Sequence, residues 1–391
     1  MDGMADDRFG RIEDVLAGHV AEGRLPGAVY LVRRGDDVHV GAVGTLAVGD
    51  QRPMQRDTIF RLASLTKVAT AVAGLILVEE CRIRLDEPID RLIPEFASPK
   101  VIRTRESELD DTVPADRAIT VRDLFTFRLG TGMDFGFSGT PLGDATAHFH
   151  RYPDQGGYTA DSFVAELGKL PLMAQPGERW IYNSGSDVLG VLIERAAGQP
   201  FAEFLHERVL APLGMRDTGF TVPEEHLGRV AHGYLADPVT GEIGAGTGPE
   251  GLRTPPDRPS PSGGLVGTVD DWLAITEMLR HAGRYPGGRM LAPMTVAAML
   301  TDQLPDAVKA VSGFLPGWFD SRGWGLGIGV GTRRDGMEAP GRYGWDGGSG
   351  TTWYTDPTTD LTAILLTQRG GFPLMSPVYL DFWASVHQAV E

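Results

Sequence analysis

A serine and a lysine three residues apart, Ser64 and Lys67, are a pair whose types and spacing predict covalent catalysis. They stand at the start of an apolar, helix-favouring run that continues to residue 78. If the helix begins at or just before Ser64, the hydroxyl and the ammonium lie one turn apart on the same helix face. A serine hydroxyl is a weak nucleophile without a neighbouring base. The spacing therefore predicts Ser64 as the nucleophile and Lys67 as the group that activates it.

The start of a helix also suits this chemistry electrostatically. Its unpaired N–H groups and the helix macrodipole favour a developing oxyanion and disfavour a protonated lysine. We therefore expect Lys67 to act as a base with a lowered pKa. Because a Ser-x-x-Lys spacing is a weak signal alone, the rest of the chain has to supply the other parts of a site.

Three loop-like stretches contain residues that suit the walls of such a site. Residues 130–137 are rich in glycine and aromatic residues, and residues 175–184 place Tyr182 just before a helical pattern at 187–197. Residues 235–263 are dense in proline, glycine and aspartate and show no periodicity. We interpret this last stretch as a long surface loop or lid near the site.

The elements that must position these residues follow from hydrophobic periodicity. Residues 7–22 predict an amphipathic helix, and residues 27–33 and 37–43 predict two strands joined by a tight hairpin. Near the other end, strand-like patterns cover residues 324–330, 342–346, 349–355 and 361–367, and a helical pattern covers 377–390. Strands at both ends with helices between them predict one sheet built from both termini, with a helical lobe inserted.

Composition narrows the class of protein. The chain has 391 residues, 42% of them hydrophobic, which is enough for two or three domains with large cores. Its 52 acidic and 36 basic residues give a formal charge of −16, which argues against nucleic acid or an anionic membrane as a partner. The acidic amino terminus lacks the apolar segment of a secretory signal, and no run is long enough to span a bilayer. We therefore expect a cytoplasmic protein.

Two motifs that would indicate other chemistry are weak or missing. Glycines alternate at positions 325, 327, 329 and 331 without a following helix, so we interpret them as a glycine-rich strand and not as a dinucleotide loop. A Gly-x-Ser-x-Gly elbow is absent from the sequence, which argues against an α/β-hydrolase. We predict no cofactor and no metal.

Several ordered segments together resemble the serine β-lactamase and penicillin-binding-protein family, closest to class C β-lactamases and family VIII carboxylesterases. The matching segments are residues 60–67, 85–88, 119–126, 176–182, 211–220, 263–268 and 344–357. The resemblance implies an α+β, two-lobed fold, an antiparallel sheet flanked by helices plus an inserted all-α lobe, with the active site in the cleft between them. On that basis residues 7–65 and 315–391 are expected to form the α/β lobe. Residues 66–314 would form the mainly helical lobe, with loop 235–263 near the cleft.

The resemblance also implies roles for individual residues. Ser64 and Lys67 match the first family element, and Tyr182 matches the tyrosine that relays the serine proton. The backbone N–H groups of Ser64 and Gly348 would form the oxyanion hole. The residues expected to bind substrate are Trp345, Asp346, Ser184, Phe135 and Trp180.

Two of these positions depart from the members of the family that process β-lactams. Ser184 stands where those members have asparagine, and Trp345-Asp346 stands where they have Lys-Thr or His-Thr. Replacing a cation by an apolar ring and an anion disfavours carboxylated substrates and leaves uncharged esters unaffected. Arg342 is the nearby residue that would oppose this conclusion, if its guanidinium replaced the missing lysine.

The sequence thus predicts a serine carboxylesterase that acts on small esters with short to medium acyl chains through a Ser64 acyl-enzyme. Alternatives are a β-lactamase or D-amino-acid peptidase or amidase, an acyltransferase, and a catalytically silent sensor that keeps the fold. Intact Ser64, Lys67 and Tyr182 count against the sensor. The physiological substrate and the oligomeric state do not follow from the sequence.

Overall fold

The computed structural model describes residues 3–150, 157–371 and 376–389, and within them the chain forms an α+β fold around one large antiparallel sheet. The strand order is β10-β11-β12-β13-β14-β1-β2. The bounds are β1 Gly27–Arg34, β2 Asp37–Gly44, β10 Arg322–Trp324, β11 Gly329–Gly331, β12 Tyr343–Gly347, β13 Thr351–Asp356 and β14 Leu361–Thr367. Because β1 pairs with β14, with Leu31 opposite Ile364, the sheet joins the two ends of the chain as predicted.

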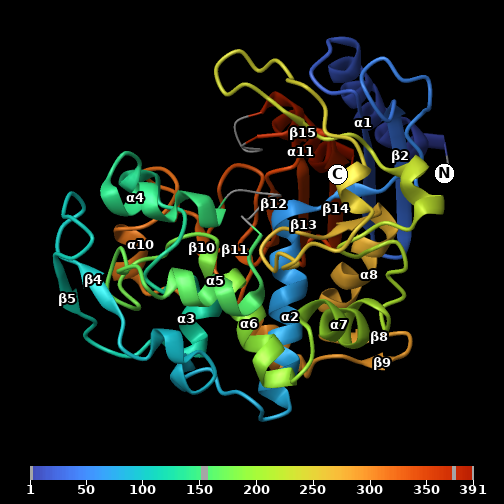
Figure 1. Cartoon of the computed structure of the whole chain (residues 1–391). Coiled ribbons are helices and arrows are strands. Elements are labelled where there is room, and N and C mark those ends of the chain that lie inside the picture. Colours follow the sequence, from blue (N-terminus) through green and yellow to red (C-terminus); the bar gives the residue numbers. More distant parts are fainter. Residues whose placement is uncertain (1–2, 151–156, 372–375, 390–391) are drawn as a thin grey trace.

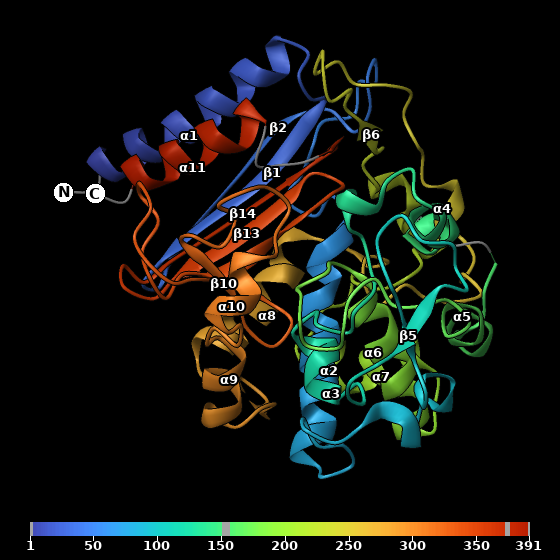
Figure 2. The same cartoon turned by 90° about the vertical axis from the view of Figure 1, so that its left-hand side faces the viewer.

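Alternation along β1 explains how the sheet separates two cores. Tyr30 and Val32 face α1 (Gly3–Ala21) and α11 (Pro377–Ala389), whereas Val29 and Leu31 face the larger core on the other side. Figure 2 shows α1 and α11 side by side across one face of the sheet, with the inserted helices beyond the other face. The predicted terminal helices are therefore present, and they cover the same face.

Helix α2 (Thr66–Glu79), which begins two residues after Ser64, runs through the larger core (Figure 1). Twelve of its 14 residues are buried, as expected for a helix that is apolar on all sides. It packs against α6 (Ser184–Ala197) and against the ring of Phe125, which would lie 2.7 Å from a Cβ added at Gly74. Close packing of this kind holds α2 in one position.

The remaining elements are short. The helices are α3 Val121–Phe125, α4 Pro141–Thr146, α5 Ala160–Leu167, α7 Phe201–Leu205, α8 Val269–Arg280, α9 Pro293–Met299 and α10 Asp306–Ala310. The two-stranded pairs are β3 Phe60–Arg61 with β7 Val266–Gly267, β4 Lys100–Ile102 with β5 Thr112–Pro114, β6 Tyr234–Leu235 with β15 Arg369–Gly370, and β8 Arg284–Tyr285 with β9 Gly288–Arg289. Among the described helices, none is both long and apolar enough to cross a membrane.

The segment from residue 324 to 330 is not the single strand that the sequence predicted. It is a hairpin, in which β10 ends at Trp324, the Gly325 N–H donates to the Ile328 carbonyl at 2.8 Å, and β11 follows. Gly327 has a φ of +82°, and a Cβ there would lie 2.4 Å from the Cβ of Ala71 in α2. The alternating glycines therefore allow a tight turn against α2. Their spacing of two residues wrongly indicated a continuous strand.

Helix α8 departs from the predicted division into lobes. Residues 66–314 were expected to form the helical lobe, but α8 packs against β1 and β14 of the sheet. Its Trp272 lies edge-on to Trp353 of β13, with ring centroids 5.9 Å apart. The α8 segment therefore belongs with the sheet, because its apolar face includes a tryptophan that pairs with a strand residue. The division at residues 65 and 315 otherwise stays a prediction.

Candidate active site

Ser64 lies in a single 3-10 turn, Ala63–Leu65, that leads directly into α2. The preceding Ala63 has a φ of +46°, a left-handed conformation that costs a non-glycine residue free energy. Hydrogen bonds to Leu62 hold the strained turn, since its N–H donates to the Leu265 carbonyl at 2.8 Å and its carbonyl accepts from Thr351 Oγ1 at 3.0 Å. The β7 segment and the sheet thereby fix the position of Ser64.

Lys67 contacts Ser64 directly. Its Nζ lies 3.0 Å from Ser64 Oγ and donates to the Ser262 carbonyl at 2.6 Å. The side chain is almost completely buried, and burial lowers the pKa of Lys67 from 10.5 to about 7, although the negative charge of Asp187 opposes the shift. Lys67 is therefore neutral in a large fraction of molecules near neutral pH and can accept the Ser64 proton.

Tyr182 approaches the same serine from the segment before α6. Its ring centroid lies 4.6 Å from Lys67 Nζ, and its hydroxyl accepts the indole N–H of Trp345 at 2.7 Å. Burial raises the pKa of Tyr182, and interactions with the Ser64 and Trp345 side chains oppose the rise. Lys67 and Tyr182 thus both interact with the Ser64 hydroxyl, as the proposed proton relay requires.

The backbone around Tyr182 is also held in an unusual conformation. Asn183 has a φ of +85°, and its side-chain amide donates to the buried carboxylate of Asp187 at 3.2 Å. The Tyr182 carbonyl accepts the N–H of Met133 at 2.7 Å, from the glycine- and aromatic-rich loop. These contacts fix the direction of the tyrosine side chain at the start of α6.

Trp345 lies on β12 and contacts the proposed catalytic tyrosine. Its indole is buried against Trp324 and Tyr182, with centroid separations of 4.6 and 5.7 Å. The family resemblance predicts that Trp345 binds substrate. The structure gives it a further contact, because it supplies a neutral N–H donor to the Tyr182 oxygen.

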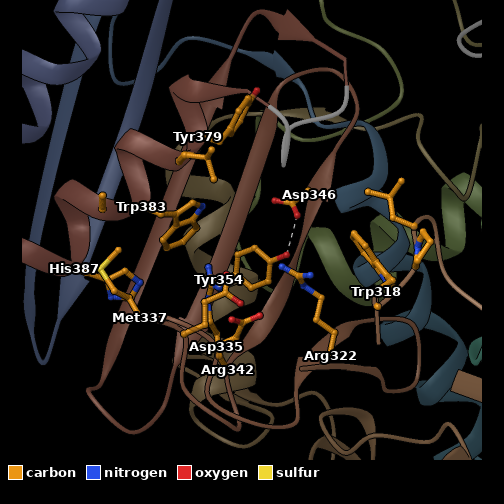
Figure 3. Close-up of a pocket in the computed structure, with 16 residues that line it drawn as sticks. Trp318, Arg322, Asp335, Met337, Arg342, Asp346, Tyr354, Tyr379, Trp383 and His387 are labelled. Atoms are coloured by element: carbon orange, nitrogen blue, oxygen red, sulfur yellow. Dashed lines mark hydrogen bonds and ion pairs between the residues drawn. The ribbon is translucent and has the colours of Figure 1, made fainter. Parts of the chain in front are cut away.

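Asp346, which was also expected to bind substrate, follows Trp345 on β12 but does not share its surroundings. Side chains alternate along a strand, so Asp346 points to the face of β12 opposite Trp345, where its carboxylate accepts the Tyr354 hydroxyl at 2.8 Å. Figure 3 shows it in a pocket of about 450 Å³ beside Trp383 of α11. This position is on the opposite face of β12 from Trp345, which the motif alone does not reveal, so it disfavours a role for Asp346 in substrate binding. That role stays a prediction.

Arg342 lines the same pocket, where Figure 3 shows it with Tyr354 and Trp383. Its guanidinium lies 3.7 Å from the centroid of the Tyr354 ring and 4.5 Å from that of Trp383, and it forms an ion pair with Glu338. Arg342 therefore cannot replace the family lysine beside Tyr182.

The other proposed substrate-binding residues occupy different depths. Trp180 is buried and packs on Tyr182 at 5.6 Å, so it supports the tyrosine ring from the core. Ser184 is buried at the first position of α6, and its hydroxyl has no hydrogen-bond partner among the described residues. Phe135 is 60% exposed and lies 6.4 Å from Phe314. Substrate contact by Ser184 and Phe135 stays a prediction.

The turn between β12 and β13 contains Gly348, the second proposed oxyanion donor. The Gly350 N–H donates to the Gly347 carbonyl at 2.9 Å, and a Cβ at Gly347 would lie 2.5 Å from the carbonyl oxygen of Leu62. Only glycine permits this close approach of the turn to the segment before Ser64. The proximity supports Gly348 as an oxyanion donor, and that role stays a prediction.

Two parts of the site were not identified from the sequence. Phe314 lies 5.0 Å from Tyr182 and 5.2 Å from Trp180, and the Ser262 carbonyl bonds Lys67. Both come from irregular segments that have no motif or periodicity, so only the folded structure shows their proximity. Among the described residues, no group of three or more His, Cys, Asp or Glu side chains is arranged to hold a metal ion.

Comparisons with known proteins agree with this geometry. The Beta-lactamase family matches residues 12–382. Protein Rv1367c of Mycobacterium tuberculosis is 38% identical over 89% of this chain and 86% of its own length. Esterase EstB of Burkholderia gladioli is 32% identical over 96% of this chain and 94% of its own length.

A solved structure shows the same fold. The structure of EstCE1, described as a hydrolase with promiscuous acyltransferase activity, superposes with a TM-score of 0.80 at 24% identity and covers 98% of this chain and 99% of its own. The family match, the esterase relative and the Ser64–Lys67 contact support a serine hydrolase of β-lactamase-like fold. The chain belongs to the Beta-lactamase family.

Proposed function

We propose that the protein is a serine carboxylesterase that cleaves esters with short to medium acyl chains. Ser64 Oγ attacks the ester carbonyl while its proton passes to Lys67, and Tyr182 relays a proton to the departing alkoxide. The N–H groups of Ser64 and Gly348 bind the oxyanion. Water then attacks the acyl-enzyme, releases the acid and returns the proton to Ser64, which leaves the enzyme unchanged.

The observation that carries this proposal is the Trp345–Tyr182 hydrogen bond. Family members that process β-lactams have a cation at the position of Trp345, and this chain has a neutral indole donor there. A carboxylated substrate loses a charge-assisted contact worth on the order of 1–3 kcal/mol, whereas an uncharged ester loses nothing. Because Arg342 lies on the other face of β12, it does not restore the charge. The name of Esterase EstB supports the same substrate class.

The test compares kcat/KM for p-nitrophenyl butyrate, nitrocefin and a D-amino-acid p-nitroanilide on one preparation, with Ser64→Ala as the control. We expect the ester to be preferred by at least about a hundredfold and all turnover to depend on Ser64. A preference for nitrocefin or the anilide would overturn the proposal in favour of an amide-cleaving enzyme.

A second arm separates hydrolysis from acyl transfer. Adding a primary alcohol to the ester reaction gives a competing acceptor for the acyl-enzyme. We expect butyric acid as the main product. A butyrate ester of the alcohol as the main product would show that the protein is an acyltransferase.

A further inference from the structure

Arg258 is a buried arginine in a loop, which calls for a physical explanation. Its guanidinium lies 3.9 Å from the centroid of the Phe163 ring and 3.3 Å from a carboxylate oxygen of Asp187. Only 4% of the side chain is exposed, and Nε and Nη2 have no hydrogen-bond partner among the described residues. Burying a cation with unused donors is costly unless a nearby anion compensates. Asp187 is that anion, and it is also completely buried.

Asp187 is connected to Tyr182 through Asn183. Asp187 lies in the first turn of α6, and its second carboxylate oxygen accepts the side-chain amide of Asn183 at 3.2 Å. Asn183 carries the backbone from Tyr182 into α6 with a φ of +85°. The carboxylate therefore supports the strained residue that directs Tyr182 towards Ser64.

Arg258 is connected to Lys67 through the segment that follows it in the chain. The chain continues from Arg258 along α2, where the Pro261 carbonyl accepts the Thr70 hydroxyl at 2.7 Å and the Ser262 carbonyl accepts Lys67 Nζ at 2.6 Å. One buried ion pair thus joins the two segments that contact the proton-transfer residues.

We propose that Arg258 and Asp187 are positioning residues for the activation of Ser64, because their ion pair fixes the contacts of Lys67 and Tyr182 and neutralises the buried carboxylate of Asp187. The inference rests on the proposed function only in requiring that Lys67 activates Ser64. It makes the end of loop 235–263 a fixed wall of the site and not a moving lid.

The charges around Lys67 give this proposal a signed consequence. Lys67 contacts the Ser64 hydroxyl, the Ser262 carbonyl and the Tyr182 ring. The charge of the Asp187 carboxylate, which is paired with Arg258, also acts on it. The negative charge of Asp187 acts to raise the pKa of Lys67. Removing that charge should lower the pKa, whereas removing the Arg258 charge leaves the carboxylate uncompensated and should raise it.

The experiment measures the pH dependence of labelling by a fluorophosphonate in the full-length protein. Labelling forms a bond between Ser64 Oγ and phosphorus and releases fluoride while the proton passes to Lys67, so its rate rises as Lys67 becomes neutral. In Asp187→Asn we expect this rise to move down by about one pH unit, and in Arg258→Met up by about one pH unit. The double variant, which again has no net charge there, should return close to the wild-type midpoint.

Two matched variants complete the design. Arg195 lies in α6, the helix that contains Asp187, but it forms ion pairs with Glu95 at 2.8 Å and Asp161 at 2.7 Å. Arg195→Met should therefore leave the pH midpoint of labelling unchanged. Arg258→Lys keeps the charge and should keep the wild-type midpoint, so it and Asp187→Asn still test the proposal if Arg258→Met does not fold.

Different results would refute the positioning role of Arg258 and Asp187 and the proposed esterase activity. Midpoints that stay fixed, or that move in the same direction in both single variants, would show that the pair is merely structural. A wild-type protein that is not labelled at all would also overturn the inference. Opposite shifts in a protein that does not cleave p-nitrophenyl esters would support the positioning role and refute the proposed esterase.

Discussion

At the residue scale, the account depends on Lys67 and Tyr182 acting on one hydroxyl. Both lie next to Ser64, and both belong to a single proton path in the proposed mechanism. We expect Lys67→Ala and Tyr182→Phe each to lower kcat by about a thousandfold. The double variant should be little worse than either single variant, because the two groups act as a unit. Losses that multiply in the double variant would show that they act independently, and stopped-flow or steady-state ester kinetics give the answer.

The buried lysine also predicts the pH profile of the enzyme. Burial lowers the pKa of Lys67 to about 7, and only the neutral amine can accept the Ser64 proton. Activity should therefore fall as the pH drops below about 7, since protonation removes the base. The measurement is kcat/KM for p-nitrophenyl butyrate over roughly two pH units on either side of that pKa. If activity instead fell only near pH 4, where carboxylates titrate, Lys67 would not be the base.

Trp345 and Trp180 offer a matched pair of substitutions. The Trp345 N–H donates to the Tyr182 oxygen, whereas the Trp180 N–H has no hydrogen-bond partner among the described residues. Replacing either indole by phenylalanine removes a similar volume beside Tyr182. We expect Trp345→Phe to lower kcat by about fivefold to tenfold, the cost of losing a hydrogen bond of about 1 kcal/mol to the Tyr182 hydroxyl. Trp180→Phe should lower kcat much less, and equal losses would show that packing alone matters.

At the element scale, the register of β12 decides which side chains reach the site. Alternation places Trp345 against Tyr182 and Asp346 in the pocket beside α11. We expect Asp346→Asn to lower the free energy of unfolding by about 1 kcal/mol, through its weakened bond with Tyr354. The ratio of kcat/KM for neutral and carboxylated esters should not change. Denaturant unfolding and ester kinetics on the same variant check both statements, and a changed ratio would return Asp346 to the substrate site.

Some elements were predictable because their patterns are local. Residues 361–367 form a short, largely apolar run of the length of a buried strand, and β14 has those bounds. A threonine just before a helix is a common N-cap, and Thr120 caps α3, where its hydroxyl accepts the Asp123 N–H. The Gly325–Gly331 segment was misinterpreted because a hairpin turn and a glycine-rich strand have the same composition. Helix α8 was assigned to the wrong layer because its periodicity does not say which surface its apolar face meets.

At the scale of the whole molecule, the site is assembled from segments far apart in sequence. The pairing of β1 with β14 brings the two ends of the chain into one sheet, and α2, α6 and β12 then meet around Ser64 (Figure 1). Ser64, Lys67 and Tyr182 were predictable because each belongs to a spaced motif. Phe314 and Ser262 were not, since their contacts arise only from long-range packing. The Arg258–Asp187 pair likewise links residues 71 positions apart.

The most direct test of the central claim is to trap the acyl-enzyme. The protein is mixed with p-nitrophenyl butyrate, quenched in acid within the burst phase, digested and analysed by mass spectrometry, with Ser64→Ala treated in parallel. The account predicts one butyryl group on the Ser64 side chain and none in the variant. A butyryl group on another residue, or ester hydrolysis at the wild-type rate by a folded Ser64→Ala protein, would contradict it.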